Sequence, residues 1–400
     1  MLSKSIFATQ FLKANRSSVV LSLRTFSTDQ KAKDPYDNIP DSILSITQRK
    51  IYKQDGHPLS TLIEKIEGFF GQGQISDLHI PGEKFKVFSD FPPLVKVKEC
   101  FDDLGIPEDH VSRRITDTYY KSRDTCLRPH TSVHQIPLMR AGNNAFICVG
   151  DVYRKDTVDK THYPAFHQME GVRTYDLKTL GVGNVAEAKL IAERDLKQVL
   201  ENLARLVFGD VEMRWIDAYF PFTEPSIELE IFYNNEWLEV LGCGVIHDKV
   251  MTRAGKDITN EVGWAFGLGL ERWAMKLFDI SDIRLFWSQD PRFITQFKQG
   301  HITKFKPYSR FPTCYKDLAF WVPPHFNENE FFQIVRHVSG DLAETVECID
   351  KFTHPKTGRE SQCFRINYRH MDRSLTNEEV DQFQVKLRQL VASELQCELR

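Results

Sequence analysis

The sequence predicts an α+β fold, in which an antiparallel sheet flanked by helices is followed by a smaller C-terminal α+β sandwich domain. Between residues 145 and 245 most apolar segments have the length and the flanking turns of strands. A single long helical period, at residues 186–208, supplies a helix to cover that sheet. From residue 307 the predicted order is strand, helix, strand, strand, helix, strand, which is the order of ferredoxin-like domains.

The composition is that of an ordinary globular protein of 400 residues, which is long enough for two or three domains. The formal net charge of -3 excludes a global positive field, so any contact with nucleic acid depends on local basic patches. The eight cysteines never have Cys-x-x-Cys spacing, which argues against a structural zinc and favours free thiols. No apolar stretch approaches the roughly 20 residues that span a bilayer, so no membrane partner is expected.

The N-terminal segment has a different composition from the rest of the chain. Residues 1–28 contain no Asp or Glu, while Lys4, Lys13, Arg16 and Arg24 are spread among Ser, Thr and apolar residues. This composition is typical of a mitochondrial transit peptide and predicts a location in the mitochondrial matrix; a disordered tail is the alternative. Residues 29–55 are polar and predict a linker.

The main domain is predicted over residues 56–289. It begins with a helix whose apolar stripe runs from Leu62 to Phe70 and ends at Gly71. Residues 263–277 predict a helix that is entered through glycines. The remaining strands of this domain are predicted at 85–88, 94–97, 145–152, 166–175, 213–220, 226–233 and 237–245.

A hinge is predicted at residues 290–306, and a ferredoxin-like domain at 307–400. Its elements are strands at 317–322, 342–352 and 363–368, helices at 328–338 and 376–395, and a short last strand.

The first candidate for chemistry is Arg154, which sits where a predicted strand ends and a loop begins. A guanidinium group is always charged and grips a phosphate with two parallel hydrogen bonds. On the return strand Phe166, Gln168 and Glu170 alternate, so they share one face that suits a purine ring and an ammonium group. The alternative is a charged hairpin with an ordinary cross-strand pair.

The second candidate is Arg272, which closes a glycine-rich segment containing Gly267 and Gly269. The dinucleotide-binding pattern Gly-x-Gly-x-x-Gly is not met, because Arg272 takes the place of its third glycine. Glycines at the start of a helix still let a phosphate approach the backbone and the helix N-terminus. The alternative is tight helix–sheet packing with Arg272 as a surface cation.

The third candidate is the segment containing Phe220 and Phe222, which point the same way on an extended chain. Two parallel rings can clamp a third aromatic ring. The alternative is that both rings are plain core.

Several segments, taken in order, match motifs of one family. Residues 150–156 with 166–170 resemble motif 2 of the class II aminoacyl-tRNA synthetases, and residues 263–272 resemble motif 3. Residues 101–107, 127–132 and 237–244 resemble the segments around the amino-acid site of the single-chain organellar enzymes specific for phenylalanine. The resemblance covers about residues 57–400.

The resemblance implies a role for each matching residue. Arg154 would bind the α-phosphate of ATP and Arg272 the γ-phosphate, and these two would be the catalytic residues. Phe166 would stack on adenine, and Glu239 would contact ATP or its Mg²⁺. The loop after Arg154 would supply further ATP contacts from Thr161, His162 and Tyr163. The residues implied to bind phenylalanine are Ser132, Val133, His134, Gln135, Gln168, Met169, Glu170, Phe220, Phe222, Ala265 and Phe266.

The implied reaction joins phenylalanine to AMP with release of pyrophosphate, and then transfers it to mitochondrial tRNA. ATP, Mg²⁺, phenylalanine and that tRNA are the expected ligands, and a monomer is the expected state. A binding protein without catalysis is one alternative, which the retained Arg154, Glu170 and Arg272 argue against. Another adenylate-forming ligase is the second, which the Phe220 and Phe222 pair and the C-terminal domain argue against.

The C-terminal domain resembles the anticodon-binding domain of the same enzymes. Single-stranded RNA loops are read by stacking and by cations on a sheet face. The candidates for RNA contacts, each of which is also explained as a solvated surface charge, are Lys351, His354, Lys356, Arg365, Arg369 and His370.

Overall fold

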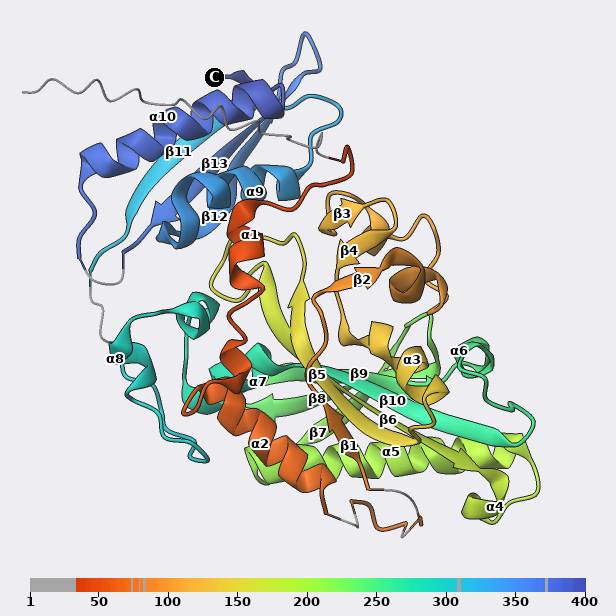
Figure 1. The fold of residues 1–400 in the computed structure, drawn as a ribbon. Helices are drawn as coiled ribbons and strands as arrows, with labels where there is room; N and C mark the ends of the chain where they lie inside the picture. The colour runs from red at the N-terminus through yellow and green to blue at the C-terminus, as the bar shows by residue number, and fades with distance from the viewer. Residues whose placement is uncertain (1–33, 73–74, 79, 82–83, 308–310, 371–372) are drawn as a thin grey trace, which may run out of the picture. The chain divides into compact units, whose positions relative to one another are not determined.

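The computed structural model describes residues 34–72, 75–78, 80–81, 84–307, 311–370 and 373–400 (Figure 1). The predicted transit peptide, residues 1–28, lies outside the described residues. Among the described residues, no helix is long and apolar enough to cross a membrane.

The main domain is built on a seven-stranded sheet with the order β1-β5-β6-β10-β9-β8-β7 (Figure 1). Only β1 runs parallel to its neighbour β5, and the other neighbouring pairs are antiparallel. The predicted antiparallel sheet is therefore confirmed. Its strands are β1 Lys86–Phe88, β5 Ala145–Tyr153, β6 Ala165–Asp176, β7 Met213–Ala218, β8 Thr223–Tyr233, β9 Glu236–Ile246 and β10 Glu261–Gly269.

Helices cover both faces of this sheet. The larger core packs α2 (Pro58–Phe70), α5 (Val185–Phe208) and α7 (Leu270–Phe278) against one face. A smaller buried cluster lies on the other face, with α3 (Gln135–Arg140) and α6 (Asp248–Arg253). The remaining elements of this domain are α1 Asp41–Ile46, η1 Ile51–Lys53, β2 Leu94–Lys96, η2 Lys98–Asp102, η3 Val111–Arg113, β3 Tyr120–Ser122, β4 Thr125–Leu127, η4 Thr131–His134, α4 Leu177–Leu180, η5 Ile283–Trp287 and α8 Pro291–Ile294.

A buried carboxylate pins α5 to the strands that carry the site. Asp195 is fully buried and accepts hydrogen bonds from Tyr175 on β6 and, at 2.9 Å, from the indole Nε1 of Trp264 on β10. Ser76 donates a third bond, and an Arg173 guanidinium nitrogen lies 3.7 Å away. Burying a carboxylate is costly unless it is paired and hydrogen-bonded, so this network fixes the position of α5 on the sheet.

The helix predicted at residues 263–277 is wrong in its first half. Residues Glu261–Gly269 form strand β10, and α7 begins only at Leu270. The glycines serve close packing between strands: a Cβ on Gly263 would lie 2.8 Å from the carbonyl oxygen of Arg173. Gly269 is the N-cap of α7, so Arg272 lies in the first turn of the helix.

The C-terminal domain has the predicted ferredoxin-like order. Its four strands pair in the order β12-β13-β11-β14, and both long helices lie on one face of this sheet (Figure 1). The elements are β11 Cys314–Trp321, α9 Glu328–Ser339, η6 Gly340–Leu342, β12 Ala343–Thr353, β13 Glu360–Tyr368, α10 Asn377–Glu394 and β14 Glu398–Leu399. The predicted domain limits themselves stay predictions; within 290–306, Phe293, Phe297 and Phe305 are buried in the core of the main domain.

Candidate active site

The hairpin of β5 and β6 places the first group of predicted site residues. The register pairs Val152 with Phe166, and alternation puts Phe166, Gln168 and Glu170 on one face of β6. Arg154 follows the end of β5, and its Nε donates to the carbonyl oxygen of Pro129 at 2.8 Å. Its guanidinium carbon lies 5.1 Å from the centroid of the Phe166 ring. The cation and the aromatic ring therefore form one unit at the mouth of the hairpin.

The two key arginines lie in one region of the molecule. Burial lowers the pKa of Arg154, and the positive charge of Arg272 lowers it further. Arg272 projects from the first turn of α7, and its Nη1 lies 2.9 Å from a carboxylate oxygen of Glu239 on β9. An anion bound close to both arginines would relieve the repulsion between their charges.

A buried carboxylate forms the centre of the second group. Glu170 is 2 % exposed, and it accepts hydrogen bonds from the amide of Gln135 and, at 3.2 Å, from the hydroxyl of Thr131. Burial raises the pKa of Glu170 to about 8. Hydrogen bonds from the hydroxyls of Ser132 and Thr131 lower this pKa and so limit the rise. The amide oxygen of Gln135 is also buried and has no hydrogen-bond partner among the described residues. A carboxylate and an unpaired amide oxygen side by side suit the ammonium group of an amino acid.

The Phe220 and Phe222 rings are stacked in the loop before β8. Their centroids are 5.9 Å apart, and their planes differ by 14°. Gly242 makes room for them, because a Cβ there would lie 2.7 Å from the Phe220 ring. Phe222 packs against the smaller buried cluster, which also contains Ala265 and Val133.

Four predicted site residues are directed elsewhere. Phe266 is adjacent to Ala265 on β10, so its ring points to the opposite face, where it stacks on Phe70 at 5.6 Å. Met169 lies between Gln168 and Glu170 and is likewise buried in the larger core. Strand alternation therefore turns the side chains of Phe266 and Met169 away from the face that carries Glu170, where they were predicted to contact phenylalanine.

His134 and Tyr163 also make other contacts. His134 stacks on Phe91 with 3.7 Å between centroids, and its Nε2 lies 2.9 Å from a guanidinium nitrogen of the buried Arg128. Burial, and then the charge of Arg128, lower the pKa of His134 to about 3. The ring is therefore neutral and accepts from Arg128, rather than facing Glu170.

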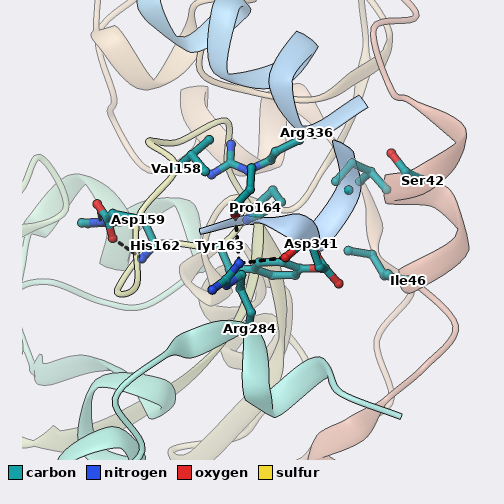
Figure 2. Close-up of a pocket in the computed structure, with 13 residues that line it drawn as sticks. Ser42, Ile46, Val158, Asp159, His162, Tyr163, Pro164, Arg284, Arg336 and Asp341 are labelled. Atoms are coloured by element: carbon teal, nitrogen blue, oxygen red, sulfur yellow. Dashed lines mark hydrogen bonds and ion pairs between the residues drawn. The ribbon is translucent and has the colours of Figure 1, made fainter. Parts of the chain in front are cut away.

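Tyr163 points away from Arg154. Its ring stacks on Trp287 at 5.6 Å, and its hydroxyl donates to Asp341 at 3.1 Å. Figure 2 shows this side of the loop, where a cavity of about 80 Å³ is lined by residues of α1, of the loop and of the segment at Gly340–Ala343. Several polar groups of the lining are already paired: Arg284 donates to Asp282 and to the carbonyl oxygen of Asp341, and Arg336 donates to the carbonyl oxygen of Asp156.

The same loop holds His162 in a tight turn. One carboxylate oxygen of Asp159 accepts from the backbone N–H groups of Thr161 and His162, at 2.6 and 2.9 Å. The other lies 2.7 Å from His162 Nδ1, a pairing drawn in Figure 2. This hydrogen bond raises the pKa of His162; burial and the charge of Arg272 oppose the shift, and Asp156 supports it. His162 is therefore protonated more readily than an isolated histidine.

Acidic side chains gather beside Arg272. Glu239 pairs across the strands with Glu230, and Glu228 lies two residues earlier on the same face of β8. Burial, and then the charges of Glu239 and Glu230, raise the pKa of Glu228. Among the described residues, no three His, Cys, Asp or Glu side chains are grouped so as to hold a metal ion alone. Mg²⁺ is usually held by one or two carboxylates together with phosphates, so Glu239 with Glu228 suits Mg²⁺ bound to a nucleotide.

Comparison with known proteins identifies the family. A model described as the class II core domain of tRNA synthetases (F) matches residues 43–297, which is more than half of the chain. The chain belongs to the class II tRNA synthetases. A second model, the ferredoxin-fold anticodon-binding domain, matches residues 309–400 of the synthetase.

The relatives of this synthetase include organellar ligases. The chloroplastic/mitochondrial phenylalanine–tRNA ligase of Arabidopsis thaliana is 50% identical over 368 residues, which are 92% of this chain and 83% of that protein. The mitochondrial phenylalanine–tRNA ligase of Mus musculus is 46% identical, over 87% of this chain and 82% of its own length. The mitochondrial phenylalanine–tRNA ligase of Saccharomyces cerevisiae is 38% identical, over 91% of this chain and 92% of its own.

The predicted RNA-binding residues of the synthetase are engaged within the protein. Both guanidinium contacts of Arg365 to Asp317 measure 2.8 Å, and Arg369 lies 3.3 Å from the buried Glu344. Lys351 lies 3.5 Å from Glu328 on α9. His370 follows the end of β13. An RNA contact by any of the first three has to compete with these carboxylates.

Sequence reasoning missed a pair that joins motif 2 to motif 3 in the synthetase. One carboxylate oxygen of Glu271 accepts from the backbone N–H of His167 at 2.8 Å, and the other lies 2.6 Å from the His167 ring. Both side chains are almost fully buried. His167 follows Phe166, and Glu271 precedes Arg272, so this pair sets the distance between two predicted ATP-binding residues. The two partners are 104 positions apart, so no local pattern reveals them.

Replacing Glu271 by alanine is expected to destabilise the synthetase by about 3 kcal/mol, because a buried, doubly hydrogen-bonded carboxylate is lost and its partners stay buried. Urea unfolding measures this change. Glu201→Ala on α5 is the control; Glu201 is half-buried and accepts from Arg205 and Trp215, and its replacement is expected to cost about 1 kcal/mol. Equal losses in the two variants would contradict the positioning role.

Proposed function

We propose that the chain is the phenylalanine–tRNA ligase of the mitochondrial matrix and that it acts as a monomer. The observation that carries this proposal is that the buried Glu170, the pair of Arg154 and Phe166, and the stacked Phe220 and Phe222 segment share one face of the sheet. The names of the three relatives described above, which are organellar phenylalanine–tRNA ligases, support the substrate and the organelle. The matches of those relatives along most of the single chain support the monomer.

The amino acid is held by its two ends. Its ammonium group lies between the carboxylate of Glu170 and the free amide oxygen of Gln135, where one charge–charge contact and one hydrogen bond fix the amine. Its ring lies against Phe220 and Phe222, with Ala265 and Val133 on the smaller cluster behind them. The carboxylate of phenylalanine is thereby directed toward Arg154.

ATP occupies the region between the two arginines. Phe166 stacks on the adenine, Arg154 binds the α-phosphate, and Arg272 with His162 binds the β- and γ-phosphates. Mg²⁺, held by Glu239 and Glu228 together with the phosphates, supplies additional positive charge there. Binding the nucleotide requires Arg272 to exchange its contact with Glu239 for a phosphate, which is possible because both side chains are about half exposed.

The reaction then follows from position and charge. A carboxylate oxygen of phenylalanine forms a bond to the α-phosphorus while the bond to the bridging oxygen breaks, and pyrophosphate leaves. Arg154 stabilises the charge that grows on the α-phosphate oxygens. In a second step a hydroxyl of the terminal ribose of tRNA attacks the acyl carbon, and AMP leaves. The C-terminal domain holds the tRNA during this step.

One assay tests this function. Phenylalanine-dependent ATP–pyrophosphate exchange measures the first step, and charging of mitochondrial tRNA(Phe) measures the second. We expect both activities with phenylalanine. Exchange without charging indicates an adenylate-forming ligase of another kind, and the absence of both activities indicates a binding protein.

Replacing Asp159 by asparagine is expected to raise KM for ATP about threefold to tenfold at pH 7.5, with a smaller change in kcat. Asparagine still accepts the backbone bonds of the turn, but the pKa of His162 falls once the carboxylate is gone. Because a histidine is charged below its pKa, wild type and variant converge as the pH falls toward 5.5. The measurement is KM for ATP in pyrophosphate exchange at several pH values.

The matched control is Asp176→Asn, since Asp176 caps α4 by accepting from the backbone N–H of Thr179 at 2.6 Å. This substitution removes the charge of a helix-capping carboxylate that does not lie beside Arg272, and it is expected to leave KM for ATP unchanged. A constant ratio of KM values between Asp159→Asn and wild type at all pH values would show a purely structural role for Asp159.

A further inference from the structure

The turn that carries Phe220 and Phe222 is built around one buried hydroxyl group, that of Ser226. Ser226 lies on β8 and is 8 % exposed. The backbone N–H of Phe220 donates to its Oγ at 3.1 Å. The same Oγ lies 2.9 Å from the carbonyl oxygen of Thr223 and 2.7 Å from the hydroxyl of Thr223. One side chain therefore joins both ends of the four-residue turn.

These contacts use the full hydrogen-bonding capacity of the Ser226 hydroxyl. A hydroxyl group donates one hydrogen bond and accepts two. The distances favour donation to the carbonyl oxygen of Thr223, and acceptance from the Phe220 N–H and from the Thr223 hydroxyl. The carbonyl oxygen of Phe220 is farther from Ser226 Oγ, at 3.4 Å, and accepts from the backbone N–H of Thr223 at 3.3 Å. Loss of the Ser226 hydroxyl thus leaves two donors of the turn without their acceptor.

The other ring of the pair is held by the backbone. The carbonyl oxygen of Phe222 accepts from the backbone N–H of His247 at 3.0 Å. The register pairs Ser226 with Gly244 on β9, and a Cβ on Gly244 would collide with the carbonyl oxygen of Pro225. The glycine therefore lets the end of the turn lie directly on the sheet.

The ring of Phe220 has less support from its surroundings. Phe222 packs against the smaller buried cluster, whereas the Phe220 ring lies beside Gly242, which has no side chain to hold it laterally. The position of the Phe220 ring therefore depends on its own backbone, and the backbone N–H of Phe220 is the group that Ser226 binds.

We propose that Ser226 is a positioning residue that fixes the Phe220 ring in the phenylalanine site. Its hydroxyl acts through the turn and does not itself touch the substrate. Aromatic rings attract one another only over a limited range of spacings, and the two rings of the turn are 5.9 Å apart between centroids. A turn that is already fixed before the substrate arrives loses less conformational freedom on binding. The proposal rests on the proposed function, because the third ring is that of the substrate phenylalanine.

The test is Ser226→Ala in phenylalanine-dependent pyrophosphate exchange with the full-length enzyme. KM for phenylalanine is expected to rise about tenfold, because two donors of the turn lose their acceptor, while KM for ATP stays within about twofold. The ratio of kcat/KM for phenylalanine to kcat/KM for tyrosine is expected to fall about threefold or more, since a looser ring site rejects an added hydroxyl less well. Ser226→Thr, which keeps the hydroxyl, is expected to restore KM for phenylalanine to within about threefold of wild type.

A double-mutant cycle examines the contact inside the turn. Thr223→Val removes the hydroxyl that donates to Ser226 and keeps the shape of the side chain. The two substitutions together are expected to raise KM for phenylalanine by less than the product of their separate effects, because both break the same 2.7 Å hydrogen bond.

The matched control is Ser339→Ala on α9. Ser339 is similarly buried, at 6 % exposed, and its hydroxyl donates to the carbonyl oxygen of Val335 at 2.7 Å. This substitution is expected to leave KM for phenylalanine unchanged. An unchanged KM for phenylalanine in Ser226→Ala, an equal rise in KM for ATP, or an equal effect in Ser339→Ala would overturn the proposal. A wild-type enzyme without phenylalanine-dependent exchange would instead refute the proposed function, so the two failures are distinguishable.

Discussion

Replacing Arg154 by glutamine is expected to lower kcat/KM for pyrophosphate exchange about 10³-fold. The guanidinium is partly buried beside Phe166, and burial already lowers its pKa, so its charge acts in a region with little water to screen it. Removing one fixed group that stabilises developing charge costs about 10²–10³-fold in rate, and the loss of ATP binding adds to this. The assay is phenylalanine-dependent exchange at saturating and at limiting ATP.

Arg154→Lys is expected to recover little of this activity. A lysine supplies the charge but lacks the planar fork that binds a phosphate with two bonds, and it cannot keep the bond to the Pro129 carbonyl while it reaches a phosphate. Arg272→Gln is expected to affect KM for ATP more than kcat, because Arg272 is exposed and meets the leaving phosphates rather than the reacting one.

The surface residue Arg205 supplies the control for these variants. It is exposed on α5, where it pairs with Glu201 at 3.4 Å, and Arg205→Gln is expected to leave exchange unchanged. The fold of Arg154→Gln is expected to be intact, since only one hydrogen bond to the protein is lost. A loss of less than tenfold in a folded Arg154→Gln enzyme would remove Arg154 from the catalytic step.

The sequence predicted those parts of the site that depend on local periodicity. Phe166, Gln168 and Glu170 were predicted to share a face because side chains alternate on a strand, and the register of β6 confirms that face. The same rule excludes Phe266, which was predicted beside Ala265 although neighbours on a strand point to opposite faces. The error arose because the family resemblance assigned the consecutive residues Ala265 and Phe266 together to the phenylalanine pocket.

Other features have no local signal. Strand β10 was predicted as a helix because its glycines were read as a helix entry, whereas the backbone of β6 at Arg173 approaches Gly263 too closely for a side chain. The contact of Glu271 with His167 joins residues 104 positions apart, and the buried Arg128 contacts Asp151, 23 positions along the chain. Such contacts depend on tertiary packing, which periodicity and motif spacing do not encode.

Replacing Glu170 by glutamine is expected to abolish phenylalanine activation and, at the same time, to stabilise the fold. Glutamine has the shape of the protonated acid and retains the bond from Thr131, but it gives the substrate ammonium group no negative charge. KM for phenylalanine is expected to rise at least 10²-fold, because a charged partner in a buried site is lost. Pyrophosphate exchange as a function of phenylalanine concentration measures this loss.

The stabilisation follows from the pKa of Glu170, which burial raises to about 8. In the unfolded chain the carboxyl group ionises near its ordinary pKa, so between that pH and pH 8 the unfolded state loses a proton that the folded state keeps. Wild-type stability therefore falls as the pH rises through this range, and the non-titrating variant avoids the loss. We expect Glu170→Gln to be more stable by about 4 kcal/mol at pH 8 and by less than about 1 kcal/mol at pH 5.

The same titration predicts how the wild-type enzyme responds to pH. Phenylalanine binds the ionised carboxylate, so KM for phenylalanine is expected to rise about tenfold for each unit by which the pH falls below 8, while kcat changes less. In Glu170→Gln the high KM is expected to be independent of pH over this range. A wild-type KM that stays constant from pH 6 to pH 8 would contradict an ammonium contact to Glu170.

Asp195 distinguishes this effect from a general response of buried carboxylates. It is as buried as Glu170, but it accepts from Tyr175, Trp264 and Ser76 and lies near Arg173, so its negative charge is balanced inside the protein. Asp195→Asn places an amide against these donors and is expected to destabilise the fold at every pH. Opposite signs for the two substitutions at pH 8 mean that the ionised Glu170 is held buried beside neutral hydrogen-bond donors at a cost in stability, because its cationic partner is the substrate.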